Sequence, residues 1–123
     1  INFGETNVTT TTSPGSIAGF VWKDSNNDHV KQSTESFFAG FQVYIDSNKN
    51  GLFDSGERTA TADSNGNYKF SNLAANVMYR VRALPPSGWH TTSTTNPPTN
   101  PWWDVFIGSG QNATGKNFGE HFG

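Results

Sequence analysis

The chain reads FQVYIDSNKNGLFDSGERTATA at residues 41–62. At residues 41–45, apolar and polar side chains alternate with the period of two that is typical of a half-buried strand. Residues 58–62 form a second short segment of β-type composition. Between the two lie the mostly polar residues 46–57. This stretch therefore predicts two β-strands that are joined by a long polar loop.

The same β-type pattern recurs in the rest of the chain. Further strand candidates lie at residues 17–23, 67–70, 77–83, 103–107 and 113–118. The turn signal DSNG at residues 63–66 predicts a hairpin between residues 58–62 and 67–70. No segment carries a credible helical period. About seven short strands with frequent turns predict an all-β fold, an antiparallel β-sandwich.

The composition is compatible with this fold and excludes several kinds of function. A length of 123 residues fits one domain around one core, and ten Phe, four Trp and three Tyr can fill it. A net charge of −2 without a basic block predicts neither nucleic-acid binding nor membrane insertion. The lack of cysteine excludes disulfides, thiolate zinc sites and cysteine nucleophiles. We expect a monomer.

A short repeat suggests that the chain is one of several modules. Residues 2–5 and residues 117–120 both read NFGE, and residues 6–13 are a Thr-rich stretch with the composition of a linker. We therefore interpret residues 1–13 as the tail of a preceding module with its linker, and residues 14–120 as one β-sandwich domain. Residues 121–123 would start the next linker. The expected partners are neighbouring domains of the same chain.

The polar loop at residues 46–57 has the ligand spacing of a calcium site. Ca²⁺ takes about six to eight oxygen ligands, which a twelve-residue loop can supply from positions 1, 3, 5, 7, 9 and 12. These positions hold Asp46, Asn48, Asn50, the carbonyl of Leu52, Asp54 and Glu57. Gly51 occupies position 6, where such a loop turns sharply. A loop that is merely polar would predict neither this spacing nor the terminal glutamate, so we predict a bound calcium ion.

Residues 24–35 repeat the spacing and predict a second calcium site. The equivalent ligands are Asp24, Asn26, Asp28, the carbonyl of Val30, Gln32 and Glu35. Two positions depart from the pattern, because His29 replaces the glycine and Gln32 replaces a carboxylate. Six of the ten acidic residues lie in the two loops, where they would repel one another without a cation. The segments on both sides are β-like, so the loops are EF-hand-like in ligand spacing only.

Several motifs together resemble the SdrD B-like repeat family. They are GFVWKD at residues 19–24, GFQVYID at 40–46, GE at 56–57, ADSNGNYKFSNL at 62–73, YRV at 79–81, PSGW at 86–89 and NFG at 117–119. The resemblance covers residues 16–120. It implies a Cna-B-like, prealbumin-like Greek-key β-sandwich that binds calcium in its loops. It also implies a tandem module of a large bacterial protein that is secreted or exposed at the cell surface.

Two hypotheses for the function remain open at this point. The first is a non-catalytic, calcium-stabilised spacer module. The second is a carbohydrate-binding module of a secreted polysaccharide-degrading enzyme, in which Trp89, Trp102 and Trp103 form an aromatic platform. Against the second, Trp89 can pack at an end of the sandwich, and one of the two adjacent tryptophans should point inward.

An enzyme is not expected. The three histidines, His29, His90 and His121, are scattered over predicted loops and the tail, with no nucleophile motif around them.

Overall fold

The computed structural model describes residues 13–28, 31–93 and 102–122, and these residues form two β-sheets and no helix. One sheet has the order β5-β2-β10-β7, and β9 also pairs with β2. Its strands are β2 (Gly15–Lys23), β5 (Asn67–Leu73), β7 (Trp89–Ser93), β9 (Asn112–Ala113) and β10 (Phe118–Phe122). The described part of the chain contains no helix that could span a lipid bilayer.

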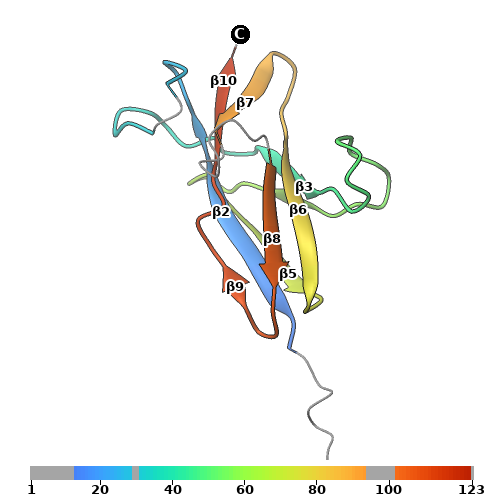
Figure 1. The fold of residues 1–123 in the computed structure, drawn as a ribbon. Helices are drawn as coiled ribbons and strands as arrows, with labels where there is room; N and C mark the ends of the chain where they lie inside the picture. Colours follow the sequence, from blue (N-terminus) through green and yellow to red (C-terminus); the bar gives the residue numbers. More distant parts are fainter. Residues whose placement is uncertain (1–12, 29–30, 94–101, 123) are drawn as a thin grey trace, which may run out of the picture.

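The second sheet has the order β4-β3-β6-β8 and packs on the first as a sandwich (Figure 1). Its strands are β3 (Gln42–Ile45), β4 (Thr59–Thr61), β6 (Val77–Leu84) and β8 (Trp102–Ile107). The predicted all-β sandwich is therefore confirmed. Most strand pairs are antiparallel, as predicted, but β2 runs parallel to both β10 and β9.

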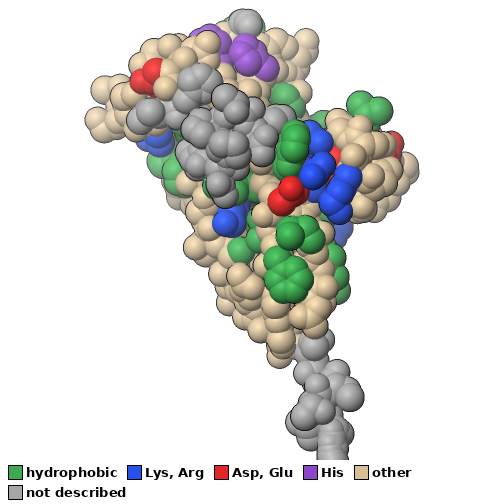
Figure 2. Space-filling model, in the orientation of Figure 1, with side chains coloured by type: hydrophobic (Ala, Val, Ile, Leu, Met, Phe, Trp, Pro, Cys, Tyr) green, Lys and Arg blue, Asp and Glu red, His purple; other side chains and the backbone are tan. Residues whose placement is uncertain are grey.

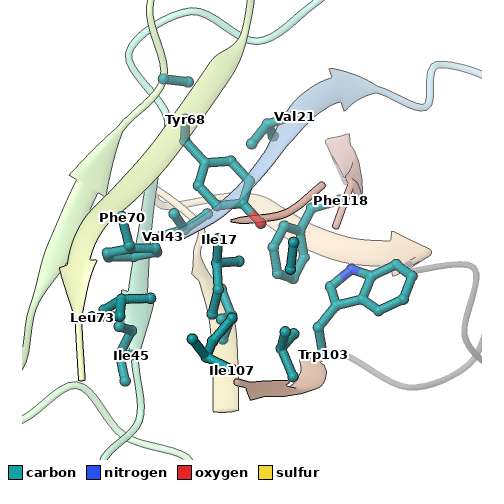
Figure 3. Close-up of a cluster of buried hydrophobic side chains, with 14 of the residues drawn as sticks. Ile17, Val21, Val43, Ile45, Tyr68, Phe70, Leu73, Trp103, Ile107 and Phe118 are labelled. Carbon is teal, nitrogen blue, oxygen red and sulfur yellow. The ribbon is translucent and has the colours of Figure 1, made fainter. Parts of the chain in front are cut away.

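The core lies between the two sheets and is built from the inward positions of both. Figure 3 shows Ile17 and Val21 from β2, Phe70 from β5 and Phe118 from β10 facing side chains of the other sheet, such as Val43. Each of these five side chains is completely buried. This burial explains the alternating apolar pattern of the sequence, because successive strand residues point to opposite faces of a sheet.

The predicted hairpin between residues 58–62 and 67–70 is wrong. β4 pairs with β3, whereas β5 pairs with β2 in the other sheet. The turn at residues 63–66 carries the chain from one sheet to the other, and the carboxylate of Asp63 accepts the N–H groups of Asn65 and Asn67 within it. Gly66 has a φ of +75°, and a Cβ there would lie 2.6 Å from a backbone oxygen of β2. The turn is therefore specified by its packing against β2.

The other differences from the predicted strands lie at residues 89–93 and at the end of the chain. β7 lies where the sequence predicted only the end of a strand and a loop, and the predicted strand at residues 113–118 is split into β9 and β10. β10 continues to Phe122, so two residues assigned to a following linker belong to a strand. The predicted linker at residues 6–13 lies almost entirely outside the described residues.

Phe70 and Phe106 offer a matched test of the core. Phe70 is completely buried, whereas Phe106 is 51% exposed on the outer face of β8. We expect Phe70→Ala to lower the free energy of unfolding by about 3–5 kcal/mol, because it removes buried contacts and leaves a cavity. Phe106→Ala should cost less than about 1 kcal/mol. Urea unfolding of both variants checks this, and equal losses would contradict the assigned core.

Glu120 is a buried acid on β10. Its side chain is completely buried, Oε2 accepts the Thr91 hydroxyl at 2.8 Å, and Oε1 has no hydrogen-bond partner among the described residues. Burial raises the pKa of the Glu120 carboxyl to about 8, and the hydrogen bond from Thr91 opposes this only in part. The folded protein therefore keeps this carboxyl protonated at pH values where an exposed glutamate is ionised.

The raised pKa of Glu120 predicts a pH-dependent stability. The unfolded chain releases this proton above about pH 4.5, whereas the folded chain holds it up to about pH 8. The contribution of Glu120 is thus fully present below pH 4.5 and is lost as the pH rises towards 8. Glu120→Gln, which stays neutral, should gain stability relative to the wild type over this range. Urea unfolding at several pH values measures the difference, and a difference independent of pH would contradict the assignment.

Candidate metal centres

The two acidic loops continue two strands and begin with fully buried aspartates. Asp24 follows β2 and Asp46 follows β3, and both have an exposed fraction of 0%. Figure 1 shows the loop after β2 and the loop after β3 projecting on opposite sides of the sandwich. We call residues 24–35 the first loop and residues 46–57 the second loop.

The two loops have the same backbone hydrogen bonds at equivalent positions. The residue before each loop donates its backbone N–H to the carbonyl of the residue after the loop. Within each loop, the N–H of position 4 donates to the carbonyl of position 1, and the N–H of position 12 donates to the carbonyl of position 9. These distances are 2.9, 3.2 and 3.1 Å in the first loop and 2.9, 3.2 and 3.1 Å in the second. Position 4 has a positive φ in both, 58° at Asn27 and 56° at Lys49. The described parts of the two loops are therefore structural copies.

The terminal glutamates hold their loops in the same way. In each loop, one carboxylate oxygen accepts the N–H of position 2 and the other accepts the N–H of position 9. The pairs are Glu35 with Ser25 at 3.0 Å and Gln32 at 2.9 Å, and Glu57 with Ser47 and Asp54, both at 2.8 Å. In both loops the first aspartate accepts the N–H of position 5 at 3.2 Å. Carboxylates at positions 1 and 12 thus close the loop.

In the first loop the carboxylates converge. One oxygen each from Asp24, Asp28 and Glu35 lies within 4.8 Å of the other two, a convergence that the described residues show in this loop alone. Asp28 Oδ2 accepts N–H groups from the side-chain amides of Asn26 and Gln32. Gln32 Oε1 is buried and has no hydrogen-bond partner among the described residues. The predicted ligand Val30 lies outside the described residues, as does His29.

In the second loop the side-chain amides gather on Asp54 instead. Asp54 Oδ2 accepts N–H groups from Asn48 at 2.9 Å and from Asn50 at 2.7 Å. Asn50 Oδ1 accepts the N–H of Leu52, whose side chain is 66% exposed. The structure thus brings Asn48, Asn50 and Asp54 together, as the spacing predicts.

The first aspartates differ in the side chain that donates a hydrogen bond to Oδ2, and Asp46 Oδ2 also accepts the N–H of Gly51 at 2.9 Å. At Asp24 it is the hydroxyl of Thr92 on β7, at 2.7 Å. At Asp46 it is the guanidinium Nε of Arg82 on β6, at 2.8 Å. Burial raises the pKa of the Asp46 carboxyl, but the N–H of Gly51 and the Arg82 guanidinium outweigh it, so that the pKa lies below its ordinary value. The second loop therefore already contains a positive charge, which sequence reasoning missed because Arg82 lies on another strand.

The three tryptophans of the predicted carbohydrate-binding platform, Trp89, Trp102 and Trp103, lie in separate environments. Trp103 is buried and donates Nε1–H to the carbonyl of Asn117 at 2.9 Å. Trp89 packs against Phe38 and Phe122, with ring centroids 4.6 and 5.3 Å apart. Carbohydrate binding through them stays a prediction.

Trp102 is half-buried on the outer face of β8, next to charged side chains. The guanidinium carbons of Arg80 and Arg82 lie 4.6 and 4.5 Å from its ring centroid, and Arg80 forms an ion pair with Asp104. Figure 2 shows basic and acidic side chains beside a hydrophobic one on this face. Trp102 therefore lies within a cluster of ionic contacts.

Two of the histidines are brought together, contrary to the expectation that they are scattered. His90 on β7 and His121 on β10 are directly paired across the strands, with ring centroids 5.6 Å apart. The sequence could not indicate this, because β7 and the end of β10 were not predicted as strands.

A family model and individual relatives agree on the family to which this chain is similar. The family described as "SdrD B-like domain" matches residues 15–114. Serine-aspartate repeat-containing protein D of Staphylococcus aureus (strain Newman) is 31% identical over 80 residues, which are 65% of this chain and 6% of that protein. Serine-aspartate repeat-containing protein I of Staphylococcus saprophyticus is 40% identical over 79 residues, 63% of this chain and 4% of that protein. The chain therefore spans a small part of these relatives.

Solved structures share the fold. The full-length major pilin SpaD from Corynebacterium diphtheriae matches with a TM-score of 0.56 and 13% identity, over 89% of this chain and 32% of that one. The major plantain pollen allergen Pla l 1 matches with a TM-score of 0.56 and 12% identity, over 87% of this chain and 94% of that one. At such low identity these matches support the fold alone.

Arg82 and Arg80 provide a matched test of the second loop. Arg82→Met leaves the buried Asp46 carboxylate without its guanidinium, which should cost about 3 kcal/mol or more in a chelator-containing buffer. Arg80→Met removes the partner of Asp104, whose side chain is 40% exposed, and should cost less than about 1 kcal/mol. Urea unfolding at neutral pH compares them. A loss at Arg80 as large as that at Arg82 would contradict the assigned role of the Asp46–Arg82 pair.

Proposed function

Because the chain belongs to the SdrD B-like domain family, we propose that it is a spacer module of a large bacterial surface protein whose two loops bind calcium. Family membership confirms that the domain is a non-catalytic structural module of surface proteins. The serine-aspartate repeat relatives support the predicted cell-surface location. Calcium binding and the role as a spacer go beyond this family assignment.

The parallel pairing of β2 with β10 is the observation that carries the spacer role. These are the first and last described strands, and they lie side by side and run in the same direction, with Val21 opposite Phe118 and Lys23 opposite Glu120. The chain therefore enters the sandwich at one end and leaves it at the other (Figure 1). Modules joined in this way extend end to end, which suits a spacer.

The geometry of the first loop fits a calcium ion. Calcium–oxygen distances are about 2.3–2.6 Å, so oxygens on opposite sides of one ion lie up to about 5 Å apart. The carboxylate oxygens of Asp24, Asp28 and Glu35 lie within 4.8 Å of one another, which allows one ion to contact all three. The buried Oε1 of Gln32, without a hydrogen-bond partner among the described residues, is a suitable further ligand.

The second loop has the same frame, and its ligands need only a local change to bind the ion. Asn48 and Asn50 now direct N–H groups at Asp54. A half-turn of a terminal amide exchanges its oxygen and nitrogen, so the same side chains can present oxygens instead. The positive charge of Arg82 beside Asp46 lowers the attraction for a second cation. We expect the first loop, in which three carboxylates already converge, to bind calcium more tightly, although its sequence departs further from the pattern.

Calcium in these loops would cross-link each loop and so stabilise the folded domain. It would neutralise carboxylates that the fold holds close together and join the end of one strand to the start of the next segment. Extracellular modules bind calcium with Kd values of about 10⁻⁴–10⁻³ M, and binding to the folded state alone stabilises it by linkage. This would serve a chain that contains no disulfide.

Removal of calcium tests the proposal. Saturating calcium, at about 100 times Kd, should stabilise the domain by about 2.7 kcal/mol for each site, so a chelator should lower the Tm markedly. Isothermal titration should find two sites in the wild type and one each in Glu35→Gln and Glu57→Gln, with the weaker site left in Glu35→Gln. Asp63→Asn, which changes a turn acid outside both loops, should keep two. Calcium titration without heat or change in Tm would refute the calcium sites.

A further inference from the structure

The histidine pair lies on the exposed edge of the first sheet, apart from the ligand side chains of the two loops. β7 and β10 run antiparallel, and the register places His90 opposite His121. Their rings are 5.6 Å apart between centroids and inclined at 70°. His90 is exposed and His121 is half-buried. Figure 2 shows the two histidine side chains gathered at one end of the molecule.

One ring of the pair is held in a defined orientation. His121 Nδ1 lies 2.7 Å from the carbonyl oxygen of Asp24. A carbonyl oxygen only accepts hydrogen bonds, so Nδ1 carries the proton. The neutral ring then has its lone pair on Nε2. Histidines that bind metals usually donate their other ring N–H to a carbonyl or a carboxylate in this way, which fixes both the tautomer and the ring orientation.

The ring spacing fits a shared ion. A transition-metal ion binds imidazole nitrogen at about 2.0–2.1 Å, which places the ion about 3 Å from the ring centre. Two rings on one ion therefore have centres up to about 6 Å apart. The observed 5.6 Å satisfies this limit. The exposure of His90 leaves the pair open to solvent, so water can fill the remaining coordination positions.

We propose that His90 and His121 together bind a divalent transition-metal cation. Imidazole suits copper, zinc and nickel, and copper(II) binds most tightly among the first-row divalent ions. Calcium prefers oxygen ligands, so this site is chemically distinct from the two loops. The proposal does not depend on calcium binding, since both metal ligands are imidazoles and the first loop contributes only the Asp24 carbonyl that orients His121.

Copper(II) titration of the chain without an affinity tag tests the site. Isothermal titration should detect binding, and electron paramagnetic resonance should show coupling to two imidazole nitrogens. His90→Phe keeps an aromatic ring against His121 but removes a ligand, and it should weaken binding at least about tenfold. His121→Asn should do the same. His29→Ala should bind copper as the wild type does.

A folding control and a second measurement distinguish loss of the metal site from loss of the fold. The Tm of each variant in a chelator shows whether it is folded. If a variant is not folded, copper should still broaden the ring resonances of His90 and His121 selectively in the wild type. Unchanged affinity in folded His90→Phe, loss of the copper signal in His29→Ala, or broadening that spares both rings would overturn the proposal.

Discussion

The architecture depends on two carboxylates, Asp24 and Asp46, that are completely buried where strands β2 and β3 end. A buried charge is costly unless hydrogen bonds and opposite charges surround it. Each loop folds back on its first aspartate so that backbone N–H groups reach it, and the terminal glutamate holds the other side of the loop. This one requirement explains why the described residues of the two loops form the same hydrogen bonds.

The two loops differ in how the buried aspartate is compensated. Arg82 supplies a guanidinium at Asp46, whereas Thr92 supplies a neutral hydroxyl at Asp24. Both groups come from other strands, β6 and β7, so each loop is bonded to the sandwich as well as to itself. In the proposed account, calcium supplies further positive charge in both loops. Because β2 and β10 are parallel, the chain enters the sandwich at one end and leaves it at the other.

Local sequence patterns predicted most of the strands and both loops. They could not predict contacts between residues that lie far apart in the sequence. Alternation in residues 41–45 and 77–83 predicted β3 and β6, whose Val43, Ile45 and Val81 lie in the core. β7 was missed because Thr91 and Thr92 are polar residues that donate hydrogen bonds to the carboxyl groups of Glu120 and Asp24, so this strand has no apolar alternation. The ligand spacing predicted two equivalent loops. It could not reveal Arg82, the histidine pair or the sheet change at residues 63–66, since each depends on strands that meet only in the folded chain.

A crystal structure grown with calcium tests the central claim most directly. The account predicts an ion about 2.3–2.6 Å from oxygens of Asp24, Asp28, Glu35 and Gln32, with the loop backbone essentially as described. In the second loop, the side-chain oxygens of Asn48 and Asn50 should face a second ion. Ions bound elsewhere, or a second loop that keeps its amide N–H groups on Asp54 at saturating calcium, would contradict it.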